Sequence, residues 1–325
     1  MIRQCAQKAP PSRRQRESAV FGACTPTQKR RDVLRVIPCA DRPLHARIED
    51  IDLSRPLSDE AFREIESALA RHGVLSFPQQ RLTPAEQKAF AERFGRLETN
   101  IANRYHEPGY PEMMILSNIR VDGEPIGFED AGQSWHTDLS YATTMGYTTM
   151  LYAVEVPHRD GRPLGATEFA STAAAYDALP DEMKQRLKGM TVMHDFDKFW
   201  ELMRAEKGSS RPPLTEAQRK ARPPTSHPIF LKHPVSGRTV LYVNPGYSVR
   251  INELPADESD RVLSSLFAHQ VQPQFVYRHA WSVGDVLIWD NLATIHNAVS
   301  DYRADERRLL KRCQTLTTRF DLTVG

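Results

Sequence analysis

The 325-residue sequence has few cysteines, no long apolar run and no large excess of charge. Its four cysteines, Cys5, Cys24, Cys39 and Cys313, include no CxxC pair. This pattern argues against a zinc site or a disulfide framework, and it favours free thiols in a reducing cytoplasm. The longest apolar segment, at residues 150–156, is far too short for a membrane span, so no membrane partner is expected.

Charge is unevenly distributed along the chain, although the formal net charge is only +2. Residues 1–33 are rich in Arg, Ser, Pro and Gln and carry the positive excess, so the remainder is slightly acidic. A slightly acidic body argues against nucleic-acid binding, which requires clustered Lys and Arg. Residues 1–33 also lack apolar periodicity and are predicted to be a disordered basic leader or extension. An over-extended start and an organelle transit peptide remain open.

Residues 34–325 are predicted to form one domain that begins with helices and continues with strands. Ser58 precedes an amphipathic segment that ends at Gly73, which predicts a capped helix. Residues 74–77 form a short apolar run that predicts a strand. Thr83 and Glu86 then have the spacing of a capping box, which predicts a second helix.

Beyond about residue 100 the pattern changes to short apolar runs between turn residues. Such runs predict a mainly β fold of the sandwich, barrel or jelly-roll type with flanking helices. Two further helices are expected, at 172–179 and 258–270. The predicted strands are 113–116, 150–156, 191–194, 228–231, 239–243, 275–277, 286–289 and 308–317. Residues 204–226 are charged, rich in proline and aperiodic, which predicts a long loop of the kind that forms lids.

His136 and Asp138 are two residues apart, so on a strand or at its end their side chains share one face. That pair can supply two ligands to one cation, although an isolated pair of this kind also arises by chance. His296 lies much further along the chain and reaches the pair only if the fold brings it there. Two histidines and one carboxylate form the facial triad of non-heme iron(II) oxygenases.

Arg308 and Arg312 are four residues apart on a predicted strand, so they share one face. Arginines that face a protein interior are costly unless they meet an anion. A guanidinium binds a carboxylate through two parallel hydrogen bonds, which a dicarboxylate cosubstrate would supply. An outward-facing basic edge strand is the alternative interpretation.

Taken in order, these segments resemble the taurine/2,4-dichlorophenoxyacetate dioxygenase family of iron(II)- and 2-oxoglutarate-dependent oxygenases. The resemblance covers roughly residues 40–320 and agrees best with the aryloxyacetate branch of the family. The segments that carry it are residues 73–77, 94–97, 135–138, 165–169, 174–180, 233–237 and 277–291.

The resemblance implies a double-stranded β-helix (jelly-roll) core with helices outside it. It assigns iron(II) to His136, Asp138 and His296, and it assigns the distal carboxylate of 2-oxoglutarate to Thr167 and Arg308. Oxygen would be the third reactant, and the products would be succinate, CO2 and a hydroxylated small molecule.

The substrate residues implied by the resemblance differ from those of the taurine enzyme. Arg312 matches an arginine that faces the acidic head of the substrate there. Asn100 and Asn103 replace a His and a Tyr, and Tyr247 replaces a Phe. Taurine is therefore expected to be a poor substrate, and a larger anion that reaches toward Tyr247 and Phe196 is expected to be better. Aryloxyalkanoates, alkylsulfonates or sulfate esters, and amino acids all remain open.

Two other classes of protein remain open beside this one. A cupin-like metal-dependent isomerase or hydrolase could use the same scaffold, and so could a non-catalytic protein that binds a small molecule. The first class would not need Thr167 and Arg308 as a carboxylate clamp, and the second would not need the intact triad of His136, Asp138 and His296. Release of succinate or CO2 from 2-oxoglutarate separates the three. The sequence leaves homo-oligomerisation open.

Overall fold

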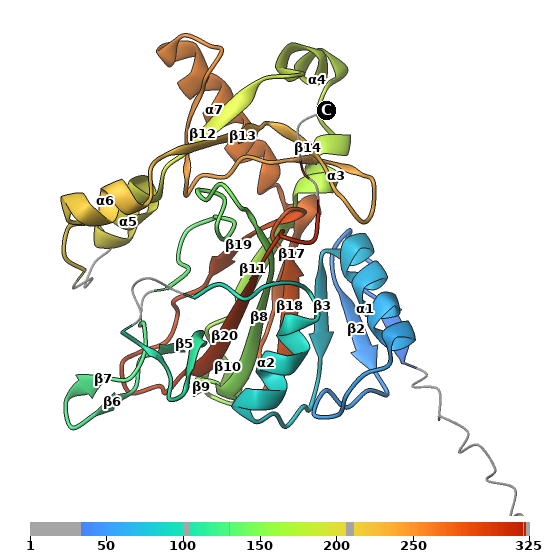
Figure 1. Ribbon diagram of the computed structural model, residues 1–325, viewed down its shortest axis with the longest axis vertical. Helices are drawn as coiled ribbons and strands as arrows, with labels where there is room; N and C mark the ends of the chain where they lie inside the picture. The colour runs from blue at the N-terminus through green and yellow to red at the C-terminus, as the bar shows by residue number, and fades with distance from the viewer. Residues whose placement is uncertain (1–33, 100–103, 130, 206–210, 321, 323–325) are drawn as a thin grey trace, which may run out of the picture. The chain divides into compact units, whose positions relative to one another are not determined.

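The computed structural model describes residues 34–99, 104–129, 131–205, 211–320 and 322. The predicted basic leader at residues 1–33 lies outside these ranges, as do Asn100 and Asn103. The described part is mainly β-sheet with flanking helices, as the sequence predicts (Figure 1). No described helix has the length and apolar composition needed to cross a membrane.

The largest sheet contains eight described strands in the order β1-β2-β3-β18-β8-β20-β5-β4. Its neighbouring strands are antiparallel except for β2 and β3, which are parallel. The strands are β1 (Arg35–Pro38), β2 (Ala46–Glu49), β3 (Val74–Phe77), β4 (His106–Glu107), β5 (Tyr110–Ser117), β8 (Gly146–Glu155), β18 (Val286–Asp290) and β20 (Leu309–Leu316).

A three-stranded sheet, β17-β11-β19, packs against the large sheet. Its strands are β17 (Val276–His279), β11 (Thr167–Ser171) and β19 (Thr294–Ala298). Phe169 on β11 contacts Trp289 on β18 edge to face, with ring centroids 5.3 Å apart. Both side chains belong to one buried apolar cluster with Leu151 of β8 and Leu310 of β20. The inward faces of the two sheets therefore share a core.

A second three-stranded sheet, β13-β12-β16, and three short strand pairs complete the described β-structure. Helix α7 (Ala256–Gln270) covers this sheet through buried Val262, Leu263 and Leu266. The strands are β12 (Thr191–His194), β13 (Thr225–Pro228) and β16 (Ser248–Ile251), with the pairs β6–β7 (Arg120–Val121, Glu124–Pro125), β9–β10 (His158–Arg159, Arg162–Pro163) and β14–β15 (Phe230–Lys232, Thr239–Leu241).

Helix α1 (Asp59–His72) begins and ends where the sequence predicts. Ser58 Oγ accepts a hydrogen bond from the Ala61 amide, and the Gly73 amide donates to Leu69 O. Gly73 has a φ of +68°, and a Cβ there would lie 2.8 Å from Leu44. Glycine is therefore required both by the backbone conformation and by the close packing.

The other helices confirm most predictions and correct one. The capping box of α2 is present, with both Thr83 and Glu86 bonded as predicted. The segment predicted as one long loop at 204–226 instead contains α6, whose own capping box joins Thr215 and Gln218. A helix that the sequence analysis did not predict, α5, precedes it. The helices are α2 (Pro84–Glu92), α3 (Thr172–Asp177), α4 (Asp181–Leu187), α5 (Phe196–Ala205), α6 (Glu216–Ala221), α7 (Ala256–Gln270) and the 3₁₀ helix η1 (Pro273–Phe275).

Two predicted strand positions are also wrong in detail. The run 228–231 is divided between β13 and β14, because the amide of Ile229 donates to Met190 O and its carbonyl accepts from Tyr242. Arg308 lies just before β20, which begins at Leu309.

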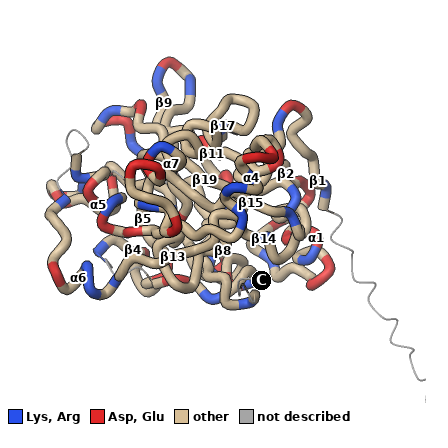
Figure 2. Tube along the Cα trace, turned by 90° about the horizontal axis from the view of Figure 1, so that it is seen from above, with Lys and Arg blue, Asp and Glu red and all other residues tan. Residues whose placement is uncertain are grey.

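Basic and acidic segments are interspersed around α5, α6 and α7 in Figure 2.

Candidate functional site

His136 and His296 are neighbours through their backbones. The amide of each donates to the carbonyl of the other, at 2.9 and 2.7 Å, which forms an isolated antiparallel bridge. Their rings are 4.1 Å apart between centroids. The sequence pattern predicted that His136 and Asp138 share a strand or its end. In the structure His136 makes only this isolated bridge and Asp138 lies in a turn, so these two residues are not on a regular strand. The fold brings together the three residues that the sequence analysis singled out.

Asp138 completes a buried group of potential metal ligands. Its Oδ1 lies 3.7 Å from His136 Nε2, and its Oδ2 lies 3.7 Å from His296 Nε2. Thr149 Oγ1 donates to Asp138 Oδ2 at 2.7 Å and holds the carboxylate in this orientation. One ligand atom from each of the three residues lies within 4.8 Å of the others, and all three residues are buried.

The electrostatics of this group suit a divalent cation. His136 Nδ1 is 2.8 Å from Ser134 O and donates to it, so Nε2 is the ring nitrogen that faces Asp138. Burial lowers the pKa of His296 to about 3, so its imidazole is neutral. Burial alone would raise the pKa of Asp138, but His296, His136 and Arg312 outweigh it and hold the pKa below its usual value. Two imidazoles and one carboxylate are the donor set of a non-heme iron(II) site.

Thr167 faces the same side of its sheet as His296. In the register of β11 and β19, Thr167 is opposite Ala298 and Phe169 is opposite His296. Opposed residues and residues two apart share one face, so Thr167 and His296 point to the same side. Thr167 Oγ1 accepts a hydrogen bond from Trp281 Nε1 at 3.1 Å. Its own hydroxyl proton is therefore available to a ligand.

Arg308 is buried beside Thr167's strand and forms no ion pair with any residue that the structure describes. Its relative exposure is 6%, and its guanidinium lies 5.6 Å from the ring centroid of Tyr302. Gly165, with a φ of +68°, leaves room for it, because a Cβ there would lie 3.1 Å from Arg308 Nε. A buried guanidinium without a carboxylate partner fits an acidic ligand.

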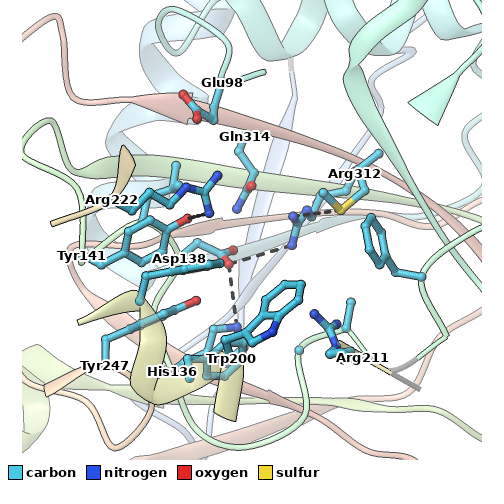
Figure 3. A pocket seen from close by; sticks show the side chains of 17 residues that line it. Glu98, His136, Asp138, Tyr141, Trp200, Arg211, Arg222, Tyr247, Arg312 and Gln314 are labelled. Carbon is cyan, nitrogen blue, oxygen red and sulfur yellow. Dashed lines mark hydrogen bonds and ion pairs between the residues drawn. The ribbon is translucent and has the colours of Figure 1, made fainter. Parts of the chain in front are cut away.

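Arg312 lies on β20 and points toward the group of metal-ligand candidates. Its Nη1 is 3.9 Å from Asp138 Oδ1, and its Nη2 is 3.0 Å from Met114 Sδ (Figure 3). Its Nε is buried and has no hydrogen-bond partner among the described residues. The two arginines predicted to share one face thus have different surroundings.

A partly open cavity lies beside His136, Asp138 and Arg312. Phe196 and Tyr247, which the sequence analysis proposed for the substrate, line it, whereas Thr167 and Arg308 do not. Several other lining residues were not predicted from the sequence. These are Glu98, Met114, Phe128, Ala131, Gly132, Leu139, Tyr141, Phe199, Trp200, Arg211, Arg222 and Gln314. Asn100 and Asn103 lie outside the described residues, so their proposed role stays a prediction.

Aromatic side chains form one side of this cavity, and we call Tyr141, Phe196, Phe199, Trp200 and Tyr247 the aromatic wall. Its rings contact one another at centroid distances of 4.8–5.8 Å. Phe199 also lies 4.6 Å from the His136 ring. Three of the five are on α5, at spacings of three and four residues. That periodicity was present in the sequence and is the signal that could have revealed the helix.

Comparisons with known proteins identify the family of the chain. Residues 40–314 match the model of the family described as "Taurine catabolism dioxygenase TauD, TfdA family". The chain is 36% identical to the alpha-ketoglutarate-dependent 2,4-dichlorophenoxyacetate dioxygenase of Cupriavidus pinatubonensis, over 84% of this chain and 96% of that protein. It is 32% identical to pentalenolactone F synthase of Streptomyces arenae, over 90% and 97% of the two chains.

A solved structure has a similar fold. The crystal structure of AAD-2 in complex with Mn(II) and N-oxalylglycine aligns with a TM-score of 0.74 and 28% identity. The alignment covers 90% of this chain and 99% of the other.

Proposed function

The chain belongs to the TauD, TfdA family of 2-oxoglutarate-dependent dioxygenases, and we propose that it hydroxylates a small anionic organic molecule. The observation that carries the proposal is the buried group of His136, Asp138 and His296 at the edge of a cavity. These residues would hold iron(II). The bound metal, together with 2-oxoglutarate and O2, would supply the oxidising chemistry, and succinate and CO2 would leave.

Thr167 and Arg308 would hold the distal carboxylate of 2-oxoglutarate. Both are buried, the Thr167 hydroxyl proton is available to a ligand, and the Arg308 guanidinium forms no ion pair with any described residue. A charge-assisted bidentate contact in a buried place fixes the cosubstrate both in position and in orientation. A cupin-like isomerase or hydrolase would have no use for this arrangement.

Arg312 would orient the acidic head of the primary substrate, since its side chain lies between Met114 and Asp138 at the cavity. The aromatic wall would exclude water from the substrate's apolar body and keep the reacting C–H bond near His136 and Asp138. An aryloxyalkanoate has a flat ring for the aromatic wall and an acidic end for Arg312. It therefore suits the cavity better than taurine, a short aliphatic aminosulfonate.

Three broader expectations remain part of the proposal. The facing sheets, with β11 and β19 opposite the β18 and β8 region, are compatible with a double-stranded β-helix core. Residues 34–325 would form a single catalytic domain in which the 204–226 segment closes over the substrate. Cys39 and Cys313 are free thiols, which agrees with a reducing cytoplasm.

The test is succinate release from 2-oxoglutarate by the purified protein, with added iron(II) and O2. A panel of aryloxyacetates, alkylsulfonates, sulfate esters and amino acids should reveal at least one compound that stimulates release. If succinate never exceeds the level of a sample without iron, with any compound in the panel, the dioxygenase assignment is wrong.

A further inference from the structure

Arg222 lies at the same cavity as Arg312 but comes from a different part of the chain. It directly follows α6, whereas Arg312 is on β20. In the view of Figure 3, Arg222 and Arg312 enter from two sides, and Gln314 lies between them. The cavity therefore presents guanidinium groups to a ligand from two separate elements.

Arg222 is held in place by aromatic rings rather than by an acid. Its guanidinium lies 4.4 Å from the centroid of Phe196 and 5.4 Å from that of Tyr141. It also donates a long hydrogen bond of 3.4 Å to Tyr141 Oη. Stacking on ring faces leaves the N–H groups in the guanidinium plane available for other partners. Arg222 forms no ion pair with any residue in the described ranges.

The charges of the described cavity residues favour more than one negative group on the ligand. Arg222 and Arg312 both line the cavity, and so do the carboxylates of Glu98 and Asp138. Asp138 belongs to the proposed metal site, where it would be offset by the cation. Glu98 interacts with Arg222 electrostatically without pairing with it. One acidic head at Arg312 would leave the second arginine uncompensated in a partly buried place.

We propose that the primary substrate is an aromatic compound with two anionic groups, in which Arg312 binds one and Arg222 binds the other. The aromatic wall lies between Arg222 and His136, because Tyr141 contacts both Phe196 and Tyr247, and Tyr247 lies 6.1 Å from His136. A flat ring stacked there would carry its second acid toward Arg222. This inference rests on the proposed function and narrows its substrate class.

The test compares two ligands of nearly equal shape, 4-carboxyphenoxyacetate and 4-nitrophenoxyacetate. The first carries two carboxylates, and the second replaces one of them with a neutral nitro group. Dissociation constants are measured by calorimetry on the protein loaded with iron(II) and 2-oxoglutarate without oxygen, so no turnover is needed. The wild-type protein should bind the dicarboxylate about tenfold or more tightly, the value of one charge-assisted contact.

Arg222→Gln should reduce this preference to about twofold or less, while affinity for the nitro compound changes little. Lys220→Gln is the matched control, because it removes one positive charge two residues before Arg222, at a side chain that is 76% exposed. Its preference should equal that of the wild type. If Arg222→Gln does not fold, the ratio of the two dissociation constants is compared between the wild type and Arg222→Lys. This variant keeps the charge and should keep the preference for the dicarboxylate.

Equal wild-type affinity for the two ligands would overturn the inference. So would an equal loss for both ligands in Arg222→Gln, because Arg222 would then share a single acidic head with Arg312. Succinate release with any substrate leaves the dioxygenase assignment intact in either case, so the two failures are distinguishable.

Discussion

The proposed metal site (His136, Asp138 and His296) and the aromatic wall meet at one cavity but are built in different ways. Strand β19 holds His296, paired backbone hydrogen bonds join His136 to it, and a hydrogen bond from Thr149 orients Asp138, so the backbone and a buried side chain position the metal site. The aromatic wall is positioned by side-chain packing between α5 and the turns that contain Tyr141 and Tyr247. A sheet register cannot shift by a fraction of a residue, whereas packed side chains can rearrange.

This difference indicates that the metal site determines the type of reaction and that the aromatic wall determines which substrate is selected. Chemistry that requires ligands at fixed separations is placed on the rigid part of the fold. Selectivity is placed on longer side chains, whose replacement leaves the sheets intact. We therefore expect changes at the two regions to affect different kinetic constants.

The largest effect is expected at the metal site. His136→Ala, Asp138→Ala and His296→Ala should each abolish turnover, since two remaining ligands leave a weak and misshapen site. Metal affinity, measured by calorimetry with Mn(II), should fall in parallel, and the circular dichroism spectrum should be retained. His158→Ala, at an exposed histidine, is the control. Full activity in any of the three variants would refute the triad.

The next effect concerns the cosubstrate alone. Arg308→Ala should raise the 2-oxoglutarate requirement by roughly 30- to several-thousand-fold, because a buried charge-assisted contact is worth about 2–5 kcal/mol. The constant for the primary substrate should change far less. Arg307→Ala is the neighbouring control, since Arg307 points outward and pairs with Glu155. A shift in the primary-substrate constant alone would mean that the roles of Arg308 and Arg312 are exchanged.

A smaller effect should distinguish substrates of the unmodified protein. Taurine should be turned over about tenfold or more slowly than the best aryl carboxylate or larger sulfonate, because it cannot fill the aromatic wall. Asn100 and Asn103 also lack the charge of a protonated histidine. Succinate release at matched concentrations gives the comparison. Taurine as the best substrate would show that the two asparagines were misinterpreted.

The smallest effect should come from the aromatic wall. Trp200→Ala should weaken binding of the primary substrate about fivefold, since loss of a partly buried aromatic contact costs about 1 kcal/mol. The 2-oxoglutarate constant should stay the same, opposite to Arg308→Ala. Equal effects on both constants would show that the two regions are not separable.

Local signals in the sequence predicted much of the fold. The caps at Ser58 and Thr83 fixed the starts of α1 and α2, because capping depends on residues three apart. The same kind of signal at Thr215 and Gln218 was overlooked inside a charged, proline-rich segment, and α6 was predicted to be loop. α5 was also overlooked, although its apolar residues recur at helical spacing on one face and its other face is charged.

The sequence by itself determined the residue types of the site: two histidines, one carboxylate, two arginines and a threonine, in a recognisable order. Only the tertiary structure decided how they are grouped. It placed His136 against His296, and it separated Arg308, beside Tyr302, from Arg312, beside Asp138. It also brought Arg222 to the cavity. The reason is physical: spacing along a chain fixes the face of a residue within one element, whereas contacts between distant elements depend on strand pairing and packing.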